Sequence, residues 1–289
     1  MVRPLGSAYM TIESGPVSRS KMQVVPVLDI KNALVVRGVM GDRASYRPIV
    51  TPLAPGPEPL TVARGLMAVH PFEALYIADL DAIEGVPRHE AGEGGPADDG
   101  PSAGAGTDAP AARRRRGEPD AVLVERLVAA HPGVTLWLDA GVTRLEDAMR
   151  IAAMPGVRVV VGSESIDGAQ SLRGLAGSAD FALSLDFRGE TFVGPAEILA
   201  DESLWPQTLI VMTLAKVGSG AGPDLERLRA VKARAGDRRV FAAGGVRGPA
   251  DLETLAAMGI AGALVATALH DGRISPADLA ALDARATPG

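Results

Sequence analysis

The sequence predicts an α/β protein with a (β/α)8 barrel, because short apolar runs alternate with helical patterns eight times along 289 residues. Compact aliphatic side chains dominate the apolar runs, as in parallel strands that helices cover on both faces. No glycine-rich loop follows the first run, which argues against an open doubly wound sheet. The expected strands are 23–29, 74–79, 134–139, 158–161, 180–185, 208–212, 239–243 and 262–266, and the expected helices lie near 59–70, 119–131, 143–154, 167–175, 195–203, 223–235, 248–258 and 275–284.

Composition narrows the class of protein. Apolar residues make up 47% of the chain, enough for a large core, and the net charge of -6 gives no electrostatic reason to expect nucleic acid or membrane as a partner. The chain has no cysteine, which excludes disulfides and thiolate chemistry, and no apolar stretch long enough to span a bilayer. We therefore expect a cytoplasmic protein without zinc-thiolate sites, and we expect it to be a monomer or small homo-oligomer.

Two segments are expected to lie outside the barrel. Residues 1–21 are interpreted as a flexible N-terminal extension, and the barrel itself as 22–289. Residues 86–118 are rich in Gly, Pro, Ala and acidic side chains and contain the four-arginine run 113–116. This composition predicts a disordered insertion, because it cannot bury enough apolar surface to offset the entropy of ordering. A solvated loop explains the arginine run better than a nucleic-acid patch does.

An internal repeat divides the expected barrel in two. Residues 138–154 align without gaps on 242–258 at an offset of 104, and the same offset places 161–163 on 265–267. The strand that ends at Asp29 also resembles the strand that ends at Asp186. Chance similarity between alanine-rich helices is the alternative, but the strand ends match as well. The pattern therefore predicts two half-barrels of four strands each.

Acidic residues end several of the expected strands, where barrel enzymes place their active sites. Asp29 and Asp186 occupy equivalent positions in the two halves, and so face each other across the mouth. A single strand-end Asp is explained well by a helix cap, whereas two opposed carboxyls can divide general acid and base work. We expect Asp29 and Asp186 to be catalytic, and Asp79 and Asp139 to have supporting roles.

Glycine and small residues after four strands predict two anion sites. Loops after the seventh and eighth strands of such barrels often bind phosphate through free backbone amides. The first site comprises Gly244, Gly245, Ala266 and Thr267, and the second, half a barrel away, comprises Gly141, Gly162 and Ser163. Such a pair suits a long small-molecule substrate that carries a phosphate at each end.

These features, taken together, resemble the histidine-biosynthesis barrels: the phosphoribosylformimino-aminoimidazole carboxamide ribotide isomerase and the cyclase subunit of imidazole glycerol phosphate synthase. The resemblance covers about 22–285 except 86–118. The motifs that carry it are Val25-Pro26-Val27-Leu28-Asp29, Val35-Val36-Arg37, Gly41-Asp42, Tyr76-Ile77-Ala78-Asp79-Leu80, Gly162-Ser163, Leu185-Asp186, Gly218-Ser219-Gly220-Ala221-Gly222-Pro223 and Ala243-Gly244-Gly245-Val246.

The resemblance implies a barrel of the ribulose-phosphate-binding type with two half-barrels and two phosphate sites. It implies an Amadori rearrangement of a phosphoribosyl aminoaldose to an aminoketose, without metal or redox cofactor, in which Asp29 and Asp186 divide the base and acid roles. We assign the base to Asp29 and the acid to Asp186, and include Arg37, Gly41 and Gly218 in the binding set.

Several positions depart from the family pattern. The family's catalytic threonine on the sixth strand aligns with Met212, and Thr213 follows one residue later as the nearest candidate. Val217 stands where the family commonly has an aspartate, and Asp139-Ala140-Gly141 replaces a run of glycines. Two alternatives therefore stay open: a divergent paralogue in one-carbon, tetrahydromethanopterin-type cofactor metabolism, and a non-catalytic barrel that binds a phosphate ligand.

Overall fold

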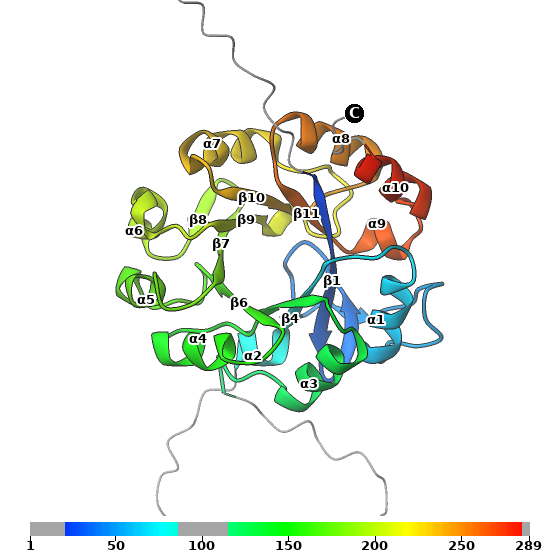
Figure 1. The fold of residues 1–289 in the computed structure, drawn as a ribbon, viewed down its shortest axis with the longest axis horizontal. Helices are drawn as coiled ribbons and strands as arrows, with labels where there is room; N and C mark the ends of the chain where they lie inside the picture. Colours follow the sequence, from blue (N-terminus) through cyan, green and yellow to red (C-terminus); the bar gives the residue numbers. More distant parts are fainter. Residues whose placement is uncertain (1–20, 86–114, 285–289) are drawn as a thin grey trace, which may run out of the picture.

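A closed parallel barrel forms the body of the protein. The computed structural model describes residues 21–85 and 115–284. Strands β1, β4, β5, β6, β7, β9, β10 and β11 pair in parallel in that order, and β11 pairs with β1 to close the ring. Figure 1 looks down this ring, with the strands at the centre and the helices around them. The predicted (β/α)8 fold is confirmed.

The barrel strands are β1 (Gln23–Lys31), β4 (Ala74–Asp79), β5 (Thr135–Asp139), β6 (Val157–Gly162), β7 (Phe181–Arg188), β9 (Thr208–Thr213), β10 (Arg239–Ala243) and β11 (Gly262–Val265). Short strands β2 (Leu34–Arg37), β3 (Arg47–Pro48) and β8 (Thr191–Val193) lie outside the ring. The helices are α1 (Pro59–Met67), α2 (Leu80–Glu84), α3 (Ala121–Ala130), α4 (Leu145–Ala152), α5 (Ala169–Leu175), α6 (Ala196–Ala200), α7 (Leu225–Ala235), α8 (Pro249–Ala257), α9 (Thr267–His270) and α10 (Pro276–Ala284), with 3-10 turns η1 (Glu202–Leu204) and η2 (Leu214–Lys216).

Several helices begin at an acidic residue that caps them. The side chains of Glu58, Asp120 and Asp224 each accept a hydrogen bond from a backbone amide in the first turn of α1, α3 and α7. Such caps satisfy amides that have no partner within the helix. They set where each helix leaves the preceding loop and turns back along the barrel.

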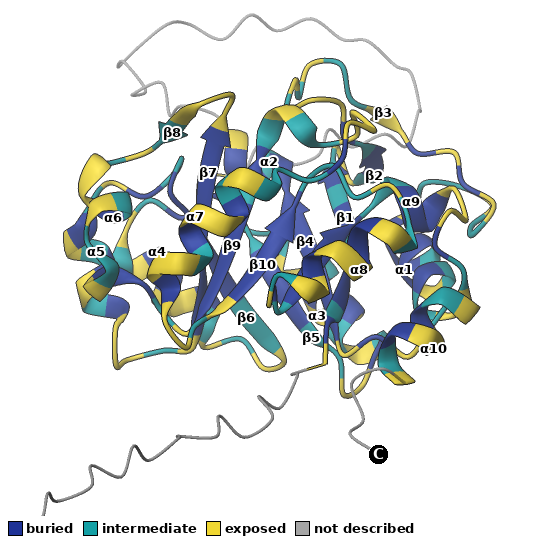
Figure 2. Ribbon diagram, turned by 90° about the horizontal axis from the view of Figure 1, so that it is seen from above, coloured by how far each residue is buried: buried dark blue, intermediate teal, exposed yellow. Residues whose placement is uncertain are grey.

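Apolar side chains pack in two layers. The larger layer lies between the strands and the surrounding helices, and a smaller one fills the inside of the ring. Figure 2 shows the strands buried at the centre and the helices exposed on their outer faces. At the centre of the inner layer, Trp137 of β5 meets Phe241 of β10 edge to face, with 4.9 Å between ring centroids. These two residues are separated by the same offset of 104 that relates the repeats.

Two antiparallel hairpins extend the first and fifth barrel strands at the same rim. In β1, Asp29 pairs with Val36 of β2, and in β7, Asp186 pairs with Val193 of β8. Figure 2 shows all three strands toward the upper edge of the barrel, with β8 at the left and β2 and β3 at the right. The sequence expectation did not include these hairpins; the strands continue past the two aspartates because each has a local partner.

The chain departs from the barrel and returns to it at one place. A Cβ atom on Gly85 would lie only 2.7 Å from Cβ of Arg116, so the two residues are adjacent. The Gly117 amide donates to the carbonyl oxygen of Ala140 at 3.0 Å, and Arg115 forms an ion pair with Asp147 at 3.2 Å. The prediction that the disordered insertion extends to residue 118 was therefore wrong for 115–118, because backbone bonds and this ion pair hold them against the barrel.

The rest of that insertion, 86–114, and the N-terminal extension to residue 20 lie outside the described residues. Lys21 belongs to the described residues, and it forms ion pairs with Glu73 at 3.6 Å and with Asp283 at 3.3 Å. Among the helices in the described part of the chain, none is both long and apolar enough to cross a bilayer.

Candidate active site

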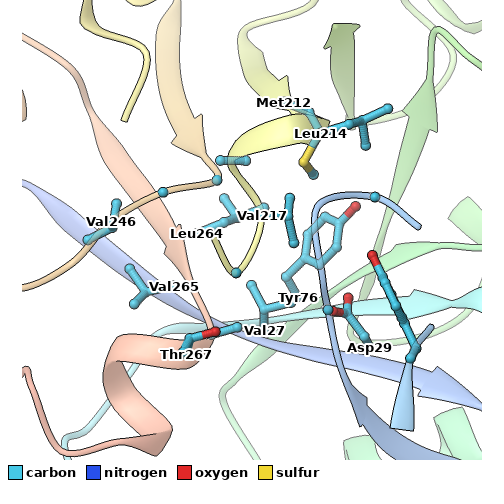
Figure 3. Close-up of a pocket in the computed structure, with 18 of the residues that line it drawn as sticks. Val27, Asp29, Tyr76, Met212, Leu214, Val217, Val246, Leu264, Val265 and Thr267 are labelled. Carbon is cyan, nitrogen blue, oxygen red and sulfur yellow. The ribbon is translucent and has the colours of Figure 1, made fainter. Parts of the chain in front are cut away.

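A cavity opens at the carboxyl ends of the barrel strands. It encloses about 1040 Å³, including space open to solvent, and both Asp29 and Asp186 line it. Figure 3 shows Asp29 and Tyr76 on one side of the cavity and Val246, Val265 and Thr267 on another. The inner core layer forms its floor through side chains such as Val27 and Leu264.

Asp29 faces the cavity without a hydrogen-bond donor from the described residues. Burial raises its pKa to about 6; the Arg43 charge opposes the shift and the Asp139 charge adds to it. Gly38 leaves the carboxylate room, since a Cβ there would lie 3.0 Å from Asp29 Oδ2. An unsupported carboxylate with a pKa near neutrality is suited to remove a proton from a bound molecule.

Asp186 is held much more firmly. Its Oδ1 accepts from Ser184 Oγ at 2.6 Å, and its Oδ2 accepts from the Glu164 amide at 3.1 Å and lies 3.2 Å from Ser163 Oγ. Burial nevertheless raises its pKa to about 7; the Ser184 hydrogen bond opposes this rise, and the nearby Glu164 and Asp139 charges add to it. The carboxyl is thus fixed in position and carries a proton in part of the molecules near neutral pH, as a general acid requires.

Asp139 is a third carboxylate in the cavity. It accepts hydrogen bonds from Tyr76 Oη at 3.1 Å and from the Gly141 amide at 3.0 Å. Burial raises its pKa to about 6 despite the Gly141 bond. Burial also raises the pKa of Tyr76 well above its ordinary value, and the Asp139 charge adds to that. Tyr76 therefore stays protonated and keeps its hydroxyl directed at Asp139.

The loop between β2 and β3 lies over the cavity. Its Gly38, Gly41, Arg43 and Tyr46 line the cavity, and the Met40 amide donates to Val217 O at 2.7 Å across the mouth. Arg43 Nη2 donates to Glu164 Oε1, which joins this loop to the end of β6. Burial raises the pKa of Tyr46 to about 12, and the Asp29 charge adds to the shift.

Glycine-rich loops form the opposite side of the cavity. Gly218, Gly244 and Gly245, which the sequence analysis expects to bind phosphate or substrate, line it together with Ala266 and Thr267, and Arg273 adds a positive charge. Glycine is required here for close packing: a Cβ on Gly245 would lie 2.3 Å from Gly222 O. Among the described residues, the amides following β10, those of Gly244, Gly245 and Val246, donate to no acceptor. Free amides beside a cation can receive an anion.

The second predicted anion site is arranged differently. Gly141, Gly162 and Ser163 do not line the cavity. The Gly141 amide is bound by Asp139, and Ser163 is fully buried with its hydroxyl 2.7 Å from Val193 O. Arg37 also lies away from the main cavity, in an ion pair with Asp271 at 2.9 Å. These four residues were expected to contact substrate directly; the structure gives them internal partners.

Thr213 does not reach the cavity either. It is buried, whereas Met212, one residue earlier on β9, lines the cavity and pairs in register with Asp186. Successive side chains of a strand point to opposite faces, so one residue decides which of them meets a ligand. The expectation that Thr213 is catalytic was wrong for this reason.

Sequence reasoning missed five polar residues of the cavity wall: Arg43, Tyr46, Tyr76, Glu164 and Arg273. Glu164 could have been found, because it directly follows the predicted Gly162-Ser163 strand end. Arg43 and Tyr46 carry no periodic signal, since they lie in an irregular loop. Within 21–85 and 115–284, no group of His, Cys, Asp and Glu is arranged to hold a metal ion.

Fold and cavity together define a (β/α)8 barrel whose cavity is lined by the carboxyl groups of Asp29, Asp139 and Asp186 and by glycine-rich loops. The histidine biosynthesis protein family matches residues 108–275, more than half of the chain, and the protein belongs to that family. An uncharacterized protein of Methanocaldococcus jannaschii is 24% identical over 258 residues, covering 87% of this chain and 94% of that protein.

Two isomerases are also similar. The phosphoribosyl imidazole-4-carboxamide isomerase of Rubrobacter xylanophilus is 32% identical over 181 residues, which cover 58% of this chain and 73% of the relative. The isomerase of the same name from Listeria monocytogenes is 26% identical over 269 residues, covering 89% of this chain and 97% of the relative.

Proposed function

We propose that the protein is an acid–base isomerase that converts a phosphoribosyl aminoaldose to the aminoketose. One observation carries the proposal: Asp29 and Asp186 line one cavity with pKa values of about 6 and 7, beside a loop whose amides are free. Two carboxyls whose environments differ in this way can act as base and acid. The names of the two isomerase relatives support the same class of reaction.

In the proposed reaction, the glycine-rich loops hold the phosphate and place the sugar between the two carboxyls. Asp186, in its protonated form, donates a proton as the ribose ring opens and the nitrogen forms a Schiff base. Asp29 then removes the proton at sugar C2, and the electrons of that bond move to give the enaminol. Asp29 returns a proton to C1 while the C2 hydroxyl gives its proton to the Asp186 carboxylate, which yields the aminoketose and restores both side chains. Each step moves only protons and bonds within the substrate, so no external oxidant or reductant is needed.

Turnover tests the proposal. We expect purified protein to convert the ribotide aminoaldose, or an N-substituted 5-phosphoribosylamine, to the ketose, with exchange of the C2 proton in deuterated water followed by NMR. Asp29→Asn and Asp186→Asn should each lower kcat by about 10²–10⁴, the usual contribution of one general acid or base. The control is Asp180→Asn, at the other end of β7 and 68% exposed, which should leave kcat unchanged. Absence of ketose with both substrates, or full activity in both cavity variants, contradicts the proposal.

A changed substrate is the second candidate, and one observation favours it. Met212 places a thioether beside Asp186 where a hydroxyl would stand in the family pattern. A thioether accepts hydrogen bonds only weakly and donates none. A paralogue that serves one-carbon cofactor metabolism is one form of this candidate.

A further inference from the structure

The two anion sites predicted from the repeat differ in whether their backbone amides are free to donate hydrogen bonds to a phosphate. After β10 the amides of Gly244, Gly245 and Val246 are free among the described residues, whereas the Gly141 amide after β5 and the amides of 163–166 after β6 are already bonded. The Gly141 amide donates to Asp139, the Glu164 amide to Asp186, and the Ser165 and Ile166 amides both to Gly162 O at 3.1 Å. A phosphate entering there would find few donors that are not already used.

The β5–β6 end and the β10–β11 end of the cavity also differ in the charges that line them. Asp139, Glu164 and Asp186 all line the cavity at the β5–β6 end, and Arg43 is the one cation of the cavity wall near them among the described residues. Arg43 is already paired with Glu164. At the opposite end, Arg273 lines the cavity and the neighbouring positions 243, 244, 245, 246, 266 and 267 are uncharged. A dianion placed among three carboxylates would be repelled at short range in a poorly solvated space.

Hydrogen bonds hold two of these carboxylates in place in the cavity wall. Asp139 is held by Tyr76 and Gly141, and Asp186 by Ser184 and Glu164, so neither can swing away to make room. Hydroxyl or amino groups of a ligand could instead donate to the free lone pairs of these oxygens. The β5–β6 end is thus built to accept hydrogen-bond donors.

We infer that Asp139 and Glu164 exclude a second phosphate, so that the substrate carries a phosphate at one end only and hydroxyl or amino groups at the other. This inference rests on the proposed function, since it names the substrate class of the same cavity. A substrate with a single phosphate distinguishes this protein from an enzyme that acts on the doubly phosphorylated ribotide. Asp139 and Glu164 are specificity-determining residues in this account.

Binding of a matched pair of probes tests the inference without any turnover. Ribulose 5-phosphate and ribulose 1,5-bisphosphate differ by one phosphate, and calorimetry measures the affinity of each for the full chain. We expect the monophosphate to bind the wild-type protein at least about tenfold more tightly, because like charges repel at close range. The double variant Asp139→Asn, Glu164→Gln keeps the acceptor oxygens and should reduce the difference to less than about threefold, or reverse it.

Glu190→Gln is the matched control, since Glu190 is fully exposed on the β7–β8 hairpin and has the same charge. It should leave the preference unchanged. Equal or tighter binding of the bisphosphate to wild type, the same preference in the double variant, or no binding of either probe would overturn the inference. Failure of the proposed function looks different: the monophosphate is preferred, yet no aminoaldose is isomerised. Conversely, turnover of the doubly phosphorylated ribotide with tight bisphosphate binding keeps the function and rejects the inference.

Discussion

The rim after β5 and β6 and the rim after β10 and β11 correspond in sequence at one offset, yet they have opposite chemistry. Asp139 corresponds to Ala243, and Glu164 corresponds to Ala268, while the glycines Gly141 and Gly245 match. Asp139 captures the Gly141 amide, whereas the Gly245 amide is free. The two rims therefore share a backbone turn, but they differ in their acidic side chains and in whether this glycine amide is already bonded. Three predictions break or sharpen this comparison.

The largest effect is expected where the two halves meet. Trp137→Ala should lower the free energy of unfolding by about 3–5 kcal/mol, because it removes a fully buried ring and leaves a void inside the barrel. Phe241→Ala should cost a similar amount, since its ring contacts Trp137 directly. Denaturant unfolding followed by circular dichroism measures both. A loss below about 1 kcal/mol in either variant would show that the ring centre is not packed as described.

A smaller effect is expected from an acid placed on the free rim. Thr267→Glu gives the β11 end a carboxylate, as Glu164 gives one to the β6 end. We expect about a hundredfold weaker binding of ribulose 5-phosphate in calorimetry, equivalent to about 2.7 kcal/mol, from repulsion of the phosphate. Thr267→Gln has nearly the same size without the charge and serves as the control. If both variants bind equally well, charge is not what distinguishes the two rims.

The smallest effect concerns pH. The proposed reaction requires Asp29 to be ionised and Asp186 to be protonated, so kcat/KM should fall below pH about 6 and above pH about 7, which gives a bell-shaped profile. The Asp139 charge raises the pKa of both groups, and Asp139→Asn removes it. Both limbs of the bell should therefore move to lower pH, by less than about one unit. A profile that moves to higher pH, or stays in place, contradicts the assigned electrostatics.

The barrel could be predicted because its signals are local and repeated. Apolar runs such as 239–243 are short and mostly aliphatic, which is typical of buried parallel strands. The structure has a strand at each expected run. The aspartates at strand ends were predicted for a similar reason: topology alone brings Asp29 and Asp186 to one rim. The hairpins that extend β1 and β7 were not predicted, because their partner strands β2 and β8 have only four and three residues.

The finer geometry of the site could not be predicted from the spacing of residues along the sequence. Whether Met212 or Thr213 faces the ligand depends on strand register, which the pattern left one residue uncertain. The hydrogen bond from the Gly141 amide to Asp139 could be found only in the structure, because a glycine after a strand predicts an anion site equally well in both halves. Arg43 reaches Glu164 across 121 positions of sequence, and no local pattern indicates such a contact.

The adjacency of Gly85 and Arg116 has a consequence for how this chain can change. Because the exit and entry points touch, a peptide of any length can be accommodated between them without altering the pairing of β4 with β5. Each doubling of such a peptide costs only about 0.6 kcal/mol of closure entropy. Evolution or an engineer can therefore insert new sequence at this position and leave the pairing of the barrel strands unchanged.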